Sequence, residues 1–106
     1  MSNKRNLKKY IDRLGSLVVE HVLPEAVILR TITEEEAYTL LGRMSEIQGR
    51  ALDHVNFSYP APARDADMRQ YRKERSAAFR KAFRQALDEY HAGVNEILAK
   101  VREKKA

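Results

Sequence analysis

The chain has 106 residues, enough for a single domain with one modest core, and its 43% apolar and 33% charged residues are typical of a folded, strongly solvated protein. It contains no cysteine, which excludes disulfides, thiolate catalysis and cysteine-based zinc sites, and its 4 Gly and 3 Pro favour long helices over a sandwich of many turns. The formal net charge of +5 is unevenly distributed, because residues 64–84 carry eight basic and three acidic side chains and residues 1–20 carry five and two.

The first 22 residues have apolar side chains at steps of three and four, the spacing that lines one face of an α-helix. Pro24 is expected to end this helix near Val22, so we predict a first helix over about 4–22. The short, β-branched stretch 25–32 fits helix, strand or coil. Because the chain shows no partner strand for it, we favour a connector that is helical with Pro24 in its first turn.

A capping box predicts the start of the second helix. Thr33 is followed three residues later by Glu36, so each side chain can accept a hydrogen bond from the backbone N–H of the other. Helical spacing of apolar residues then continues, which predicts a helix over about 34–56. A proline-containing loop over 57–65 follows, and its aromatic residues, Phe57 and Tyr59, are expected to fold back over the core.

The third predicted helix covers about 66–103 and is roughly 55 Å long at 1.5 Å per residue, much longer than the other two. Asp65 or Asp67 is placed to cap its start. Its last apolar residues, Ile97 to Val101, need more cover than the two shorter helices are expected to provide, which favours self-association. The apolar stripe of this helix comprises Phe79, Phe83, Leu87, Tyr90, Val94, Ile97, Leu98 and Val101.

Two turns before Phe79, the same face of the third helix changes from apolar to basic. Arg72 lies in the sector of the stripe, with Arg69 and Arg75 beside it. A guanidinium group is rarely buried without a partner, because its desolvation costs several kcal/mol. We therefore expect the first three turns of this helix to project past the core or to line a wet groove.

An up, down, up order of three antiparallel helices places the starts of the first and third helices at the same pole. The basic side chains of both starts would then form one cluster, which suggests a polyanion such as a nucleic-acid backbone, with Tyr10, Tyr59 and Tyr71 near enough to stack on bases. The predicted phosphate-contacting residues are Arg69, Arg72, Lys73, Arg75, Arg80 and Arg84, aided by Lys4, Lys8 and Lys9.

The sequence thus predicts an all-α, antiparallel bundle of three main helices and a non-catalytic accessory protein that binds RNA or DNA backbone through its basic pole. We expect no cofactor and no metal site, no association with a membrane, a cytoplasmic location, and a homo-oligomer. Two alternatives remain open. In the first, the basic pole is a solvated face, or it binds an acidic protein or a second copy of the chain. In the second, the protein is an adaptor, chaperone or inhibitor that binds its partner through Phe57, Tyr59 or an end of the third helix.

A third hypothesis comes from Arg84 and His91, which form an Arg, six residues, His pattern on one helix face. This pattern resembles the RNase motif of HEPN domains, helical dimers that cut RNA with an arginine and a histidine from each subunit. The resemblance implies a ribonuclease in which His91 acts as general base. A chain with this many arginines and three histidines is expected to contain roughly one such match by accident, so the ribonuclease is the most remote alternative.

Overall fold

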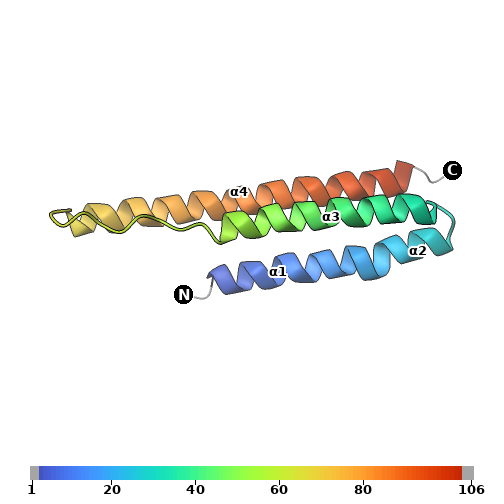
Figure 1. The fold of residues 1–106 in the computed structure, drawn as a ribbon, viewed down its shortest axis with the longest axis horizontal. Coiled ribbons are helices and arrows are strands. Elements are labelled where there is room, and N and C mark those ends of the chain that lie inside the picture. Colours follow the sequence, from blue (N-terminus) through green and yellow to red (C-terminus); the bar gives the residue numbers. More distant parts are fainter. Residues whose placement is uncertain (1–2, 104–106) are drawn as a thin grey trace.

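The computed structural model describes residues 3–103 and shows three helical segments packed side by side as a rod of 63 × 20 × 16 Å (Figure 1). The described residues contain no strand, and the all-α prediction is confirmed. The first segment runs in one direction, the second returns and the third runs parallel to the first. The elements are α1 (Asn3–Leu17), η1 (Val18–Val22), α2 (Leu23–Ile28), α3 (Glu34–Val55) and α4 (Met68–Glu103).

The first helix does not end near Val22, because a turn of π-helix carries it past Pro24. The Leu23 N–H donates to the Val18 carbonyl, five residues back, instead of to the residue four back. Pro24 has no N–H, and its ring would clash with the carbonyl four residues earlier in a regular α-helix. The wider π-turn tolerates proline at this point, so α1, η1 and α2 form one continuous helical segment.

The corner between α2 and α3 is closed by a Schellman motif. The Thr31 N–H donates to the Ala26 carbonyl at 2.8 Å, and the Arg30 N–H donates to the Val27 carbonyl at 3.0 Å. This motif requires a left-handed residue, and Arg30 takes that role with a φ of 60°. The stretch 25–32 is therefore half helix and half turn, in agreement with the helical connector that we favoured.

Both predicted N-caps are present. The Glu36 N–H donates to Thr33 Oγ1 at 3.1 Å and the Thr33 N–H donates to Glu36 Oε1 at 2.9 Å, which completes the capping box of α3. Asp67 caps α4, since its Oδ1 accepts from the Arg69 N–H at 3.0 Å. The observed start of α4 at Met68 lies two residues after the predicted one.

The core lies where α3 is flanked by the first segment and by α4. Tyr90 is its largest fully buried side chain, and the Tyr90 hydroxyl donates to the Ile11 carbonyl at 2.5 Å, which joins α4 to α1. Earlier in α4 the buried positions are small: Ala82 and Ala86 face the core, whereas Phe79 and Phe83, which we expected there, are half-buried beside them. Small residues occupy this face because α3 and α4 approach closely.

The excess length of α4 lies at its beginning, contrary to our expectation that its end would lack cover. Ile97 is fully buried, whereas no residue between Met68 and Lys81 is. These 14 residues, about 20 Å of helix, extend beyond the end of α3 (Figure 1). The connection 56–67, which we call the strap, runs out along this overhang and returns at its tip.

Candidate nucleic-acid interface

We call residues 57–84, which comprise most of the strap and the opening turns of α4, the basic arm. This region holds eight Lys or Arg and three Asp or Glu. Four of its cations, at positions 69, 73, 80 and 84, fall within a sector about 60° wide when α4 is viewed down its axis. They form a row about 22 Å long along one edge of α4. The row consists of Arg69, Lys73, Arg80 and Arg84, all exposed.

Arg72 and Arg75 point in the direction that the core-facing residues take further along α4. Both side chains are exposed because α3 has already ended at this level, so the prediction that these turns project past the core is confirmed. The Arg75 guanidinium lies 4.8 Å from the centre of the Phe79 ring, a cation–π contact. This contact holds the guanidinium against an aromatic face and leaves its other side open to solvent.

Little of the positive charge of the basic arm is neutralised within the protein. Across residues 3–103, the ion pairs join Arg43 to Glu46 and Glu96, and His54 to Glu89, all outside the arm. Within the arm, the Asp67 carboxylate caps α4 and the Glu74 carboxylate accepts from the Gln70 amide at 2.9 Å. The positive end of the α4 dipole lies at the same tip and adds to the field.

An aromatic ladder fastens the strap to α4 and gives the arm its shape. Phe57 meets Phe79 edge to face at 5.3 Å between ring centres, and Tyr59 meets Tyr71 at 5.6 Å. The Tyr71 hydroxyl donates to the Pro60 carbonyl at 2.6 Å. Phe57 and Tyr59 therefore do fold back, but onto the overhanging turns of α4 and not over the core. Half-buried in these contacts, Phe57 and Tyr59 offer little surface to an adaptor's partner.

The three lysines of α1 lie closer to the base of the arm than to its tip. Tyr10 contacts His91, which sets α1 and α4 in parallel with an offset of about 80 positions. By this register Lys4 is level with Arg84, and Lys8 and Lys9 lie further from the tip. Both helices begin toward the same end, as the predicted order requires, but Lys4 is about 20 Å from the level of Arg69 along the axis.

The pair behind the HEPN resemblance is divided between two environments. Arg84 belongs to the exposed row, whereas His91 Nε2 is 2.7 Å from the Tyr10 hydroxyl and its ring packs against the Tyr10 ring. Nε2 of His91 therefore already has a hydrogen-bond partner. Tyr10, in turn, is occupied at mid-molecule and does not join Tyr59 and Tyr71 near the tip.

Two ionisable side chains of α4, Glu89 and Tyr90, form hydrogen bonds to other helices. Gln85 and His54 donate to the Glu89 carboxylate from two helices, and these hydrogen bonds, that of Gln85 foremost, lower its pKa. Burial raises the pKa of Tyr90 to about 12. In the part of the chain that the structure describes, no three His, Asp or Glu side chains are grouped to hold a metal ion, and no helix is long and apolar enough to cross a membrane.

Sequence reasoning missed an apolar groove at the other end of the molecule, between α2 and α3. Ile28 and Tyr38 at its rim are 78% and 73% exposed. The signal was present in the apolar stretch 26–32, which we used only to choose between helix and strand.

Comparisons of the chain with protein-family models, with curated proteins and with solved structures found no match.

Proposed function

We propose that this chain is a small, non-catalytic accessory protein whose basic arm binds the phosphate backbone of RNA or DNA. The observation that carries the proposal is the row formed by Arg69, Lys73, Arg80 and Arg84, four exposed cations without carboxylate partners on one straight helical edge. Clustered Lys and Arg attract phosphates with little regard for base sequence, and binding releases the counterions condensed on the nucleic acid.

The geometry of the arm suits contact with several phosphates at once. The strap holds the helix rigid and keeps the cations in fixed positions. Little backbone conformational entropy is therefore lost when the arm binds. Arg72 and Arg75, on the side of α4 that faces the core further along the helix, present additional guanidinium groups, whose planar forks match phosphate oxygens in pairs. The side-chain hydroxyl of Tyr71 is engaged with the strap, so we assign recognition to charge and not to base stacking.

This proposal makes a quantitative prediction about salt. If the four cations of the row each neutralise one phosphate, the logarithm of the binding constant should fall with the logarithm of salt concentration with a slope of about −3 to −4. We expect binding to heparin, to single-stranded RNA and to duplex DNA, with small differences between base sequences. An apolar adaptor contact predicts weak dependence on salt, so the same titration separates the two functions.

The test is charge reversal in the row against a matched control. The triple variant Arg69→Glu, Lys73→Glu, Arg80→Glu should abolish binding to labelled RNA and retention on heparin. The control Arg13→Glu, Arg50→Glu, Lys100→Glu changes the net charge equally at exposed positions outside the arm. The control should retain most of the affinity and nearly the same salt slope. Equal loss in both variants would reject the arm as the binding site, and retained binding in the first would reject the proposal.

A further inference from the structure

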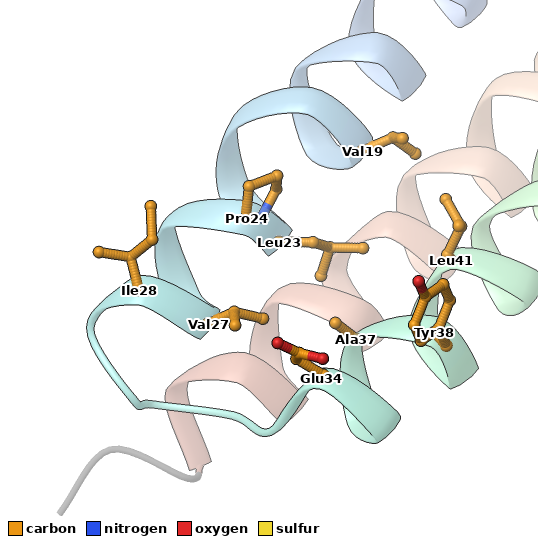
Figure 2. A pocket seen from close by; sticks show the side chains of 9 residues that line it. All are labelled: Val19, Leu23, Pro24, Val27, Ile28, Glu34, Ala37, Tyr38 and Leu41. Atoms are coloured by element: carbon orange, nitrogen blue, oxygen red, sulfur yellow. The ribbon is translucent and has the colours of Figure 1, made fainter.

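The groove between α2 and α3 is an apolar hollow at the end of the molecule opposite the arm. It has a volume of about 430 Å³. Figure 2 shows Leu23, Val27 and Leu41 turned toward the space between the two helices. The rim residues Ile28 and Tyr38 and the neighbouring Leu29 are mostly exposed, the last at 67%. Three of the large, strongly exposed apolar side chains of residues 3–103 thus gather at one end, where an uncovered apolar surface is typical of an interface.

Three carboxylates lie on the two helices that form this groove. Glu34 lines it, and Glu25 and Glu35 are exposed in the first turns of α2 and α3. Residues 17–41 contain five Glu and only one cation, Arg30. Among residues 3–103, no basic side chain forms an ion pair with Glu25, Glu34 or Glu35. The groove therefore fits an occupant that combines an apolar contact with several positive charges.

The basic arm of the same chain has this chemistry. It carries the exposed cations described above, and Met68 at its tip is a large apolar side chain that is 43% exposed. Two grooves placed face to face would oppose carboxylate to carboxylate, and two arms would oppose cation to cation. Contact between an arm and a groove is the pairing that brings opposite charges together. Charge complementarity therefore selects a second copy in a particular orientation.

We infer that the groove holds the basic arm of a second copy, in an antiparallel dimer with two identical contacts. A two-fold axis perpendicular to the rod, midway between arm and groove, brings each arm to the level of the partner's groove and closes the assembly. A side of the rod measuring 63 by 20 Å exceeds the roughly 800 Å² per partner of a typical stable interface. This dimer goes beyond the polyanion binding proposed above, although both use the arm, so a polyanion and the second copy compete for it.

The experiment is complementary charge reversal, measured by analytical ultracentrifugation at low and physiological salt. A groove variant carries Glu34→Lys and Glu35→Lys, and an arm variant carries Arg69→Glu and Lys73→Glu. Each variant alone opposes like charges at both contacts, so its dimerisation constant should be at least tenfold weaker than that of the unchanged chain. An equimolar mixture restores both contacts and should form a heterodimer. Circular dichroism confirms that each variant is folded.

A second variant avoids any effect on helix capping. Tyr38→Asp alters only an exposed rim residue, so it should weaken the dimer at least tenfold and leave the helicity unchanged. An unchanged chain that is monomeric at all concentrations overturns the inference. A mixture that does not associate also overturns it, as does a mass that grows beyond the dimer into open chains. A chain that dimerises but does not bind heparin refutes only the proposed function, and one that binds heparin as a monomer refutes only the dimer.

Discussion

Residues 68–81 and residues 82–103 belong to one uninterrupted helix, yet they are held in place by different means. The second part packs against α3 and buries Tyr90, Val94 and Ile97 in the core. The aromatic side chains of the first part contact the strap, and all side chains of this part are exposed or half-buried. The comparison shows how a short chain keeps an unshielded row of cations in a fixed shape without burying any of them.

Two physical effects keep the overhang helical. Extension from the packed part avoids the unfavourable nucleation step, because the overhang continues a helix that is already formed. Its composition, rich in Arg, Lys and Ala, has high helix propensity. The strap then adds aromatic contacts on one side. We therefore expect a substitution in the packed part to change the free energy of unfolding of the whole protein. A substitution in the arm should loosen only the arm.

The largest effect is expected at Tyr90 in alkaline solution. Burial, aided by the nearby Tyr10 and Asp12, raises the pKa of Tyr90 to about 12 from 10.0. A folded-state pKa above the unfolded value stabilises the fold fully below pH 10, and this contribution is lost as the pH rises from 10 to 12, up to about 3 kcal/mol. Urea unfolding between pH 9 and 12 measures it. In Tyr90→Phe the free energy of unfolding should fall less steeply between pH 10 and 12. An equally steep fall would show that ionisation of Tyr90 is not its cause.

The second prediction concerns the closest approach of α4 to α3. A Cβ atom added at Gly93 would lie 2.7 Å from Ile47, which is buried and cannot withdraw, so Gly93→Ala should lower the free energy of unfolding by about 1–3 kcal/mol. At Gly49 an added Cβ meets nothing within 4 Å. Gly49→Ala, the matched control, should raise the free energy of unfolding by about 0.5–1 kcal/mol. Thermal melting of both variants checks the sign; two changes of the same sign would refute the close contact.

Much of the fold was predictable from local patterns. Helical periodicity placed three helices, the Thr33 to Glu36 spacing placed the start of α3, and the unfavourable burial of guanidinium groups predicted that Arg72 would be exposed. These features depend on neighbours within one helix, where spacing along the chain determines spacing in space. The cations of the row could be named for the same reason, because all four lie on one helix.

The remaining features depend on how the helices meet, which spacing along one helix does not contain. Pro24 usually ends a helix, and only the π-turn at Val18 allows the chain to pass it. The face of α4 with the largest residues is not the one closest to α3, because close approach requires Ala82 and Ala86 there. The position of the overhang likewise depends on where along α1 the Tyr90 side chain of α4 makes its contact. The groove depends on the turn between α2 and α3, which brings these two helices side by side.

The third prediction addresses the arm. Phe57→Ala removes the ring that contacts Phe79 and Tyr59, so the strap should detach and the opening turns of α4 should fray. Phe57 is half-buried, and we expect a local loss of about 1–2 kcal/mol with a small change in melting temperature. Trypsin should then cleave at the arginines of the arm several-fold faster. Met68→Ala, at an exposed position in the same region, is the control; equal acceleration in both would show that the ladder does not hold the arm.

The smallest effect is expected from Tyr71→Phe, which removes only the hydroxyl that donates to the Pro60 carbonyl. The carbonyl lies near solvent and can accept from water instead, so the loss should be about 0.5–1 kcal/mol and confined to the tip. Hydrogen exchange of the amides near Tyr71 should speed up a few-fold, while amides of the packed part keep their rates. If exchange accelerated equally along the whole of α4, the helix would be one cooperative unit, and the division between arm and packed part would be wrong.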